Sequence, residues 1–157
     1  MALSSVLIPF IGQNYGAGKN ERIILANRFS ILFVSIWGAA AWGVLAILAG
    51  SIARAFADDS EIQNLITQYL WIVPFGFAFH GISQLVSASC NALHLPFHST
   101  AINIMRLFLI LIPLVYLGSN LWNTAGFFFG ISAANFITGM IAWLWYRSSI
   151  LDFTSDQ

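Results

Sequence analysis

Long apolar stretches, separated by short polar segments, dominate the chain. Four of them cover residues 29–50, 62–91, 99–117 and 124–146. A helix needs roughly 20 predominantly apolar residues to cross the hydrocarbon core of a bilayer, and each stretch is about that long or longer. The segments between them hold glycines, prolines, asparagines and charges, which are typical of turns. The pattern therefore predicts an all-α fold, a polytopic membrane helix bundle with four full transmembrane helices.

A shorter apolar stretch, residues 1–12, precedes these four. As a helix it would rise about 18 Å, whereas the hydrocarbon core is about 30 Å thick. We therefore expect an N-terminal helix stub, the end of a helix whose beginning lies outside this sequence, which would make the chain a fragment. A genuine short protein is the alternative. The glycines and asparagines of residues 13–20 predict a turn after the stub.

The stretch 62–91 is longer than one crossing requires, and Pro74 lies inside it. Proline removes a backbone hydrogen bond and clashes with the preceding turn, so we expect a kink near residues 70–74. Pro96 is expected to break the connection 92–98 to the next helix. The side chains just before 62–91 can accept hydrogen bonds from its first free backbone N–H groups, and the candidate N-caps are Asp58, Asp59 and Ser60.

Composition excludes most soluble classes of protein. Hydrophobic residues make up 59% of the chain and charged residues only 8%, whereas a soluble domain carries roughly 25% charged residues. No charged residue occurs between Arg28 and Arg54, between Glu61 and Arg106, or between Arg106 and Arg147. So few charges cannot cover the surface of a water-soluble fold, and a net charge of zero offers no basic surface to nucleic acid. The lipid bilayer is thus an expected partner, and nucleic acid is not.

The positive charges predict the orientation of the chain. Cytoplasmic segments of membrane proteins carry an excess of lysine and arginine. Arg54 alone lies on one side, whereas the other side receives Lys19, Arg22, Arg28, Arg106 and Arg147. We therefore expect the C-terminus to lie in the cytoplasm. The expected membrane is a bacterial inner membrane. The chain is expected to divide into a transmembrane bundle, 1–147, and a polar cytoplasmic tail, 148–157. Because Arg106 lies within the apolar stretch 99–117, we expect its side chain to reach for the interface or to pair inside the bundle.

A stripe of polar residues runs along the stretch 62–91. His80, Gln84 and Asn91 fall on much the same face of a helix, with Ser87 between them. Titratable groups inside a membrane are costly and usually face a bundle interior or a water-filled path, and histidine exchanges protons near neutral pH. His80, Gln84 and Asn91 are therefore candidates for contacts with a substrate or an ion. A neutral histidine that is satisfied by a neighbouring helix is the alternative.

The stretch 124–146 carries features of helix packing. Gly126 and Gly130 form a pair of small residues four positions apart, which lets two helix backbones approach closely. Asn135 and Thr138 form a second polar stripe, which is typical of hydrogen bonds between helices. We therefore expect this helix to pack closely on a neighbour.

No motif for an enzyme, a metal or a cofactor is complete. The stretch 12–19 resembles a phosphate-binding loop, but its final lysine is followed by Asn20 rather than by serine or threonine. His94 and His98 have the spacing of metal ligands, but Pro96 prevents a regular helical turn between them and no third ligand is nearby. We therefore expect no catalytic residue, no metal and no cofactor.

The segment 9–22 (PFIGQNYGAGKNER) resembles the loop that follows the second helix of each half in the multidrug and toxic compound extrusion (MATE) family. The residues that match the pattern of this loop are Gly12, Gln13, Asn14, Gly16, Ala17 and Gly18. A long helix with an internal proline, Pro74, also fits the family, as do the connection 91–96 and the position of Arg106 in the following helix. The resemblance extends over residues 1–147.

The resemblance implies that the chain is the C-terminal third of such a transporter, from the end of its eighth helix to its twelfth. MATE transporters have two six-helix bundles around a central cleft and export amphiphilic, often cationic, small molecules in exchange for protons or sodium. The missing N-terminal bundle would then be a partner, and the helix over 62–91 would line the cleft and bend at Pro74. The glycine-rich turn would be structural. Aromatic side chains that would contact drugs or lipid are Phe75, Phe77 and Phe79.

The coupling ion and the function stay open at this point. Some sodium-coupled members of the family carry a carboxylate in the tenth helix, near the position of His80 and Gly81. Because no Asp or Glu occurs here between Glu61 and Asp152, coupling to protons, or an ion site placed elsewhere in the protein, is favoured over sodium coordination by this portion. The alternative to a transporter fragment is a small, non-transporting membrane anchor or assembly protein. The coding sequence upstream of Met1 discriminates between the two.

Overall fold

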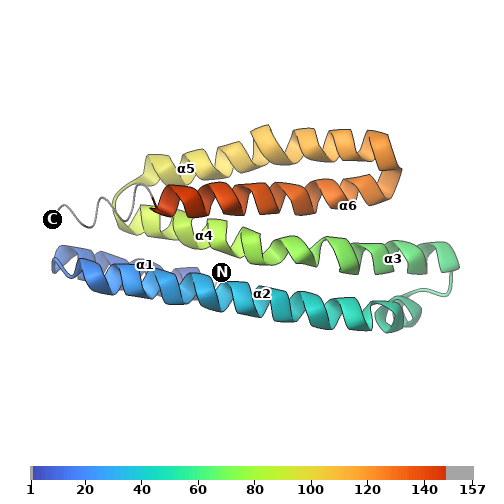
Figure 1. The fold of residues 1–157 in the computed structure, drawn as a ribbon, viewed down its shortest axis with the longest axis horizontal. Coiled ribbons are helices and arrows are strands. Elements are labelled where there is room, and N and C mark those ends of the chain that lie inside the picture. The colour runs from blue at the N-terminus through green and yellow to red at the C-terminus, as the bar shows by residue number, and fades with distance from the viewer. Residues whose placement is uncertain (1, 148–157) are drawn as a thin grey trace.

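The computed structural model describes residues 2–147, and the polar tail expected over 148–157 lies outside them. Figure 1 shows long helical rods, with α1 along the first part of α2, and with α4 between α2 and α6. A 3-10 turn, η1 (Pro74–Gly76), joins α3 to α4, and a π-helical segment, η2 (Met105–Leu111), joins α5 to α6. The α-helices are α1 (Ala2–Gly16), α2 (Asn20–Phe56), α3 (Ser60–Ile72), α4 (Phe77–Ala92), α5 (Pro96–Ile104) and α6 (Ile112–Trp145).

Three helical runs are long and apolar enough to cross a membrane, and they cover 20–56, 60–92 and 96–145. The third run folds back on itself, because Trp122 and Asn123 have non-helical backbone angles, with Asn123 at φ 50°. Asparagine is one of the few residues that adopts this left-handed conformation readily. The two halves of α6 therefore lie antiparallel (Figure 1), which confirms the expected bundle of four full helices with an N-terminal stub.

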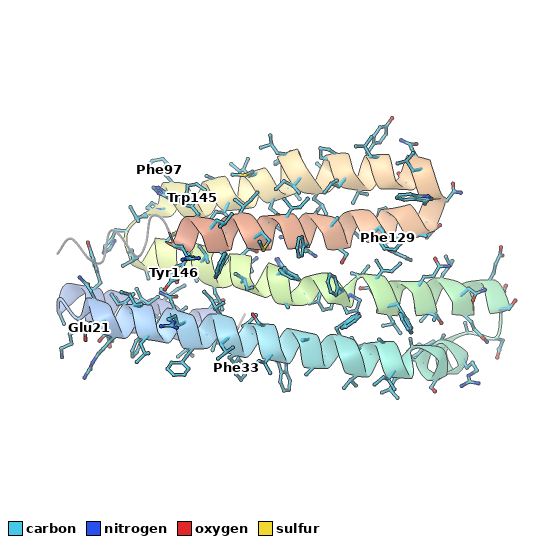
Figure 2. The ribbon with its side chains drawn as sticks, viewed as in Figure 1. Glu21, Phe33, Phe97, Phe129, Trp145 and Tyr146 are labelled. Atoms are coloured by element: carbon cyan, nitrogen blue, oxygen red, sulfur yellow. The ribbon has the colours of Figure 1, made fainter. Side chains whose placement is uncertain are left out.

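Apolar side chains cover the outer faces of the helices (Figure 2). Phe33 on α2 is 57% exposed, and Phe97 on α5 is 87% exposed. In water such a surface would drive aggregation, whereas in a bilayer it meets acyl chains that are equally apolar. The exposed surface therefore fits an integral membrane protein.

The helices extend further than the apolar stretches that predicted them. The stub α1 continues past Gly12 to Gly16, so the turn expected over 13–20 shrinks to residues 17–19. The helix expected to begin over 21–28 and to span 29–50 is α2, which begins at Asn20 and continues past residue 50 to Phe56. The reason is that charged residues end the lipid-buried part of a helix without interrupting its backbone hydrogen bonds, and neither flank of α2 contains a proline.

The structure confirms the expected kink and one of the expected caps. α3 ends at Ile72, and Pro74 opens the 3-10 turn that separates it from α4. The Asp59 carboxylate accepts a hydrogen bond from the backbone N–H of Glu61 at 2.7 Å, so it caps α3. The expected break in the connection 92–98 is present over residues 93–95, and Pro96 itself begins α5, where the missing N–H costs nothing.

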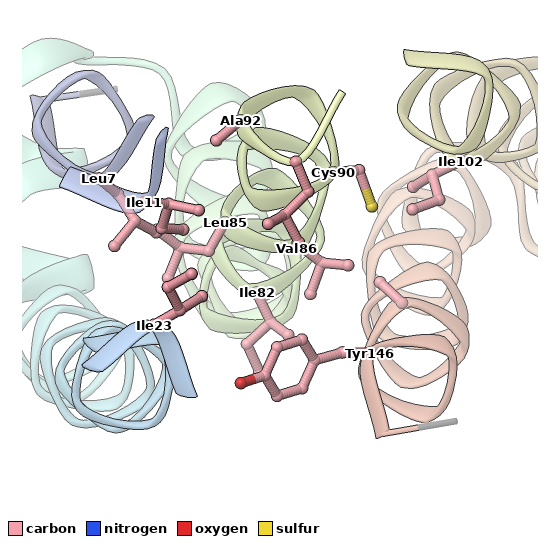
Figure 3. Close-up of a cluster of buried hydrophobic side chains, with 12 residues drawn as sticks. Leu7, Ile11, Ile23, Ile82, Leu85, Val86, Cys90, Ala92, Ile102 and Tyr146 are labelled. Atoms are coloured by element: carbon pink, nitrogen blue, oxygen red, sulfur yellow. The ribbon is translucent and has the colours of Figure 1, made fainter. Parts of the chain in front are cut away.

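α4 is the central helix of the described chain, because it contacts α1, α2, α5 and α6. One apolar cluster forms around it (Figure 3). In this cluster Leu85 of α4 points toward Leu7 and Ile11 of α1, and Tyr146 reaches in from the end of α6. α4 therefore sets the positions of all its neighbours.

The hairpin inside α6 depends on glycine. A Cβ atom on Gly118 would collide with the backbone of Gly126, and a Cβ atom on Gly126 would collide with the backbone of Gly118. A Cβ atom on Gly130 would likewise collide with the backbone of Leu114 and Val115. The close packing expected at Gly126 and Gly130 is therefore confirmed, and the neighbour is the first half of α6.

We predict that Gly126→Val destabilises the chain, because its side chain must displace the opposite backbone. Overpacking of this kind costs about 1–3 kcal/mol. Gly43→Val is the matched control, since a Cβ atom on Gly43 meets nothing within 4 Å. The measurement is the temperature at which each detergent-extracted variant aggregates. A Gly126→Val chain as heat-stable as the control would contradict the close approach.

Candidate functional site

The polar stripe on α4 lies along the side of the helix that the described chain covers least. His80 and Gln84 are half-buried and Asn91 is exposed, whereas the faces beside them pack against neighbouring helices. With 3.6 residues per turn, these three residues and Phe77, which is 44% exposed, point within about 60° of one another. The structure thus brings the three predicted site residues to one open side of the central helix.

One residue of the stripe is tied to α5 instead. The hydroxyl groups of Ser87 and Ser99 are hydrogen-bonded at 2.6 Å, and both side chains are buried. Asn103 adds a second bond, because its Nδ2 donates to Ser87 Oγ at 3.2 Å. These bonds join α4 to α5 at the level of Ser87. The open part of the stripe therefore consists of His80 and Gln84 before this level and Asn91 after it.

Two polar side chains, those of Arg106 and Asn135, join η2 to α6, and the first of them acts electrostatically on His80. Arg106 Nη2 donates a hydrogen bond to Asn135 Oδ1 at 3.2 Å, and Asn135 is only 4% exposed. The positive charge of Arg106 lies within electrostatic range of the His80 ring. Among residues 2–147, the buried atoms His80 Nδ1 and Arg106 Nε have no hydrogen-bond partner. The cluster therefore holds two basic side chains with unused hydrogen-bonding capacity.

The sequence marks these residues as candidates, but it does not show that they associate. Of the two outcomes expected for Arg106, pairing inside the bundle is the one observed. Asn135 joins helices as expected, and it does so as the acceptor for this arginine. A signal for the pairing exists in the sequence, since a buried arginine needs an acceptor and no carboxylate is available between Glu61 and Asp152.

The glycine-rich motif forms a tight turn at the end of α1. Asn14 is buried, its Nδ2 donates to the carbonyl of Phe10 at 2.8 Å, and its own carbonyl accepts from the Lys19 N–H at 2.9 Å. Gly18 has a backbone φ of 66°, a conformation that residues with a side chain rarely adopt. Gly12 lies against the end of α4, at the carbonyl of Ala92. The remaining motif residues, which continue the helix or complete the turn, are Gln13, Gly16 and Ala17.

An apolar groove lies at the kink, where α2, α3 and α6 meet. It encloses about 690 Å³, and its aromatic lining consists of Trp42, Trp71, Phe75, Phe129 and Phe136. The Nε1–H of Trp42 donates to the carbonyl of Trp71 at 2.8 Å, so the groove is left almost without polar groups. Of the three phenylalanines expected to contact drugs or lipid, Phe75 lines this groove, Phe77 lies beside the stripe, and Phe79 packs against Phe136.

Comparisons with known proteins agree with this architecture. The profile of the MatE family matches residues 1–117. A Shewanella oneidensis protein named FAD transporter is 33% identical over 140 residues, which cover 89% of this chain and 31% of that protein. The crystal structure of the Vibrio cholerae MATE transporter VcmN in its bent form has a TM-score of 0.89 at 28% identity, over 95% of this chain and 34% of that chain.

A further solved structure shares the fold. The MATE transporter ClbM in complex with Rb⁺ has a TM-score of 0.86 at 24% identity, over 98% of this chain and 36% of that chain. The chain thus spans about a third of the length of its relatives. The relatives are transporters by name, and the family match covers most of the sequence. This chain therefore belongs to the MATE (MatE) family of membrane transporters.

Proposed function

We propose that this chain forms the cleft-lining part of a cation-coupled efflux antiporter. Family membership and the apolar helices support membrane transport. The open side of α4, with His80, Gln84 and Asn91, supports the position of the cleft. Because the chain spans about a third of its relatives, a transport cycle requires the remaining two thirds, including a bundle that faces the stripe. The chain alone is therefore not expected to transport.

Protons are the coupling ions that these residues support best. The observation that carries this proposal is a buried histidine nitrogen without a partner, on His80, within electrostatic range of Arg106. Proton uptake by His80 would place a second positive charge near Arg106, and like charges repel strongly where little water screens them. Repulsion between them favours a movement of α4 away from η2, and the kink at Pro74 is where such a movement can bend the helix.

The charge beside the stripe favours an anionic cargo. Arg106 is the one charged residue between Glu61 and Arg147. Arginine binds phosphate and carboxylate through paired hydrogen bonds, and its Nε has no partner in the described chain. The Shewanella relative is named FAD transporter, and FAD carries a diphosphate between aromatic ring systems. We therefore propose an anionic dinucleotide of this class as the first candidate cargo, ahead of the amphiphilic cation that the family resemblance implies.

Amphiphilic cations are the second candidate cargo. The aromatic groove at the kink favours them, because aromatic faces attract cations and its large apolar surfaces suit hydrophobic drugs. The groove and the His80–Arg106 cluster are neighbours, because Asn135, the acceptor for Arg106, lies on α6 close in sequence to Ser132 and Phe136, which line the groove. Transport of different solutes distinguishes the two sites.

A chimaera tests the cargo and the role of His80 together. In it, this chain replaces the aligned third of the Shewanella FAD transporter, and FAD transport is measured in proteoliposomes with an imposed proton gradient. The chimaera should transport FAD, and His80→Ala and Arg106→Gln should each lower the rate about tenfold or more, because a hydrogen bond to a charged group contributes about 1.5–3 kcal/mol. His94→Asn is the matched control, since His94 is exposed in a turn with φ 59°.

Each alternative has its own outcome in this experiment. Transport by the parent protein but not by the chimaera favours the non-transporting anchor. Transport of ethidium, an amphiphilic cation, without transport of FAD favours the second cargo. A His80→Ala chimaera that transports at the rate of the His94→Asn control contradicts the role given to His80.

We further propose that the chain lies in a bacterial inner membrane with its C-terminus in the cytoplasm. The turn 17–19, the connection 93–95 and the end of α6 gather at one end of the bundle (Figure 1). Lys19 and Arg147 lie in these segments, whereas Arg54 lies in the last turn of α2 at the opposite end. The excess of positive charge supports a cytoplasmic position for the first end.

A pair of reporter fusions after the last residue checks this orientation in a bacterial host. Green fluorescent protein should fluoresce there and alkaline phosphatase should stay inactive, because only the phosphatase requires export to fold. Active phosphatase with dark fluorescent protein would reverse the orientation. Fusions at Ala57, in the loop at the other end, should give the opposite pattern.

A further inference from the structure

A groove with a charged mouth lies between α2 and the end of α6. It encloses about 890 Å³, and Arg28 from α2 and Arg147 from the end of α6 line it together. Trp143 and Tyr146 form its wall on α6, and apolar side chains such as Phe29 and Leu32 form its wall on α2. These elements are far apart in the sequence, so the groove is a product of the fold. It is separate from the cluster around His80 and from the aromatic groove at the kink.

The two arginines bring positive charge that the described chain leaves without a counter-charge. No aspartate or glutamate among residues 2–147 lines the groove. Among residues 2–147, neither Arg28 nor Arg147 forms an ion pair, and the Arg147 guanidinium lies over the ring of Trp143 at 5.1 Å from its centroid. Stacking of this kind fixes the plane of the guanidinium and leaves its N–H groups free to bind an anion. The groove therefore presents two cationic donors at one place.

A buried polar atom points to the same location. Tyr146 reaches from α6 toward α2 (Figure 3) and is only 4% exposed, and its hydroxyl has no hydrogen-bond partner among the described residues. Arg28 lies within electrostatic range of this hydroxyl. A buried hydroxyl without a partner costs free energy, so an acceptor that enters the groove would satisfy it.

The position of the groove in the membrane selects the type of anion. Arg147 lies just past the last residue of the third apolar run, and Arg28 lies at the start of the long uncharged part of α2. Both guanidinium groups are therefore at the level where lipid headgroups lie, with tryptophan and tyrosine beside them as is typical of membrane interfaces. Below them the groove continues along Phe29 and Leu32, which are 62% and 55% exposed. An acyl chain fits this apolar part and a phosphate fits the mouth.

We propose that this groove binds an anionic phospholipid, with Arg28 and Arg147 holding the phosphate and the apolar wall of α2 holding an acyl chain. Basic pockets between transmembrane helices on the cytoplasmic side are a recurrent way to bind such headgroups. A zwitterionic lipid carries its own ammonium group, so it neutralises the two arginines less well. The bound lipid would fasten α2 to the end of α6, two elements that flank the central helix α4.

Native mass spectrometry of the 157-residue chain in detergent tests this proposal. The probes are phosphatidylglycerol and phosphatidylcholine with identical acyl chains. Phosphatidylglycerol should bind more tightly, and Arg28→Gln with Arg147→Gln should weaken its binding about fivefold for each arginine removed. Arg22→Gln is the matched control, because Arg22 lies near the same end of α2 but does not line the groove. This control should bind phosphatidylglycerol as the original chain does.

Three results would overturn the proposal. The first is equal binding of the two lipids. The second is a loss of phosphatidylglycerol affinity in the Arg22→Gln control as large as in the groove variants. The third is displacement of phosphatidylglycerol by inorganic phosphate at equal concentration, which would indicate a site for a free anion. Occupation of the groove by another protein segment would also appear as equal, weak binding of both lipids.

A second measurement does not depend on the arginine variants folding. Brominated acyl chains quench nearby tryptophan fluorescence, and the Trp143→Phe variant identifies the emission that comes from the groove. Brominated phosphatidylglycerol should quench Trp143 at lower lipid content than brominated phosphatidylcholine does. Equal quenching by the two lipids would contradict a preference for the anionic headgroup.

Discussion

In a hydrocarbon environment every polar group must find its partner inside the protein, and the architecture of this chain follows from that constraint. The long helices satisfy their own backbone groups. The polar side chains are concentrated on α4 and on the faces that meet it, where Ser87 bonds to Ser99, and Ser89 bonds to Asn27 at 2.6 Å. α4 is thus held to α5 on one side and to α2 on another by buried hydrogen bonds.

Three buried polar atoms that have no hydrogen-bond partner within residues 2–147 are informative against this background. His80 Nδ1 and Arg106 Nε lie in one cluster, and the Tyr146 hydroxyl lies at the end of α6. Asn135 satisfies part of the arginine, but no carboxylate neutralises its charge in the described chain. Such groups are costly inside a membrane, so their presence is explained most simply by a solute, a proton or a lipid that completes them. The first cluster supports the proposed transport and the second position supports the lipid site.

Much of the fold could be predicted from the sequence, because hydrophobic length alone decides which segments cross a bilayer. The four crossings, the kink at Pro74 and the close approach at Gly126 each follow from one local feature. The π-helical segment η2 could not be predicted, because no residue type marks it. The hairpin at Asn123 is tighter than expected, because helix continues through most of the predicted turn.

The candidate site could be predicted only in part. The spacing of His80, Gln84 and Asn91 along a helix is a local property, so their common face could be read from the sequence. The meeting of Arg106 with Asn135 joins two helices, and the grooves beside Trp42 and Arg28 depend on how far apart helices lie. Such features depend on the tertiary packing of side chains, which the periodicity of a single segment does not encode.

Thiol accessibility in the chimaera tests most directly whether the open side of α4 faces water. Gln84→Cys and Val44→Cys are compared, since Val44 is 55% exposed on the lipid-facing surface of α2. The native Cys90 is 4% exposed, so its background reaction is small. A membrane-impermeant methanethiosulfonate should modify Gln84→Cys much faster than Val44→Cys. Equal rates at the two positions would contradict a water-filled path along α4.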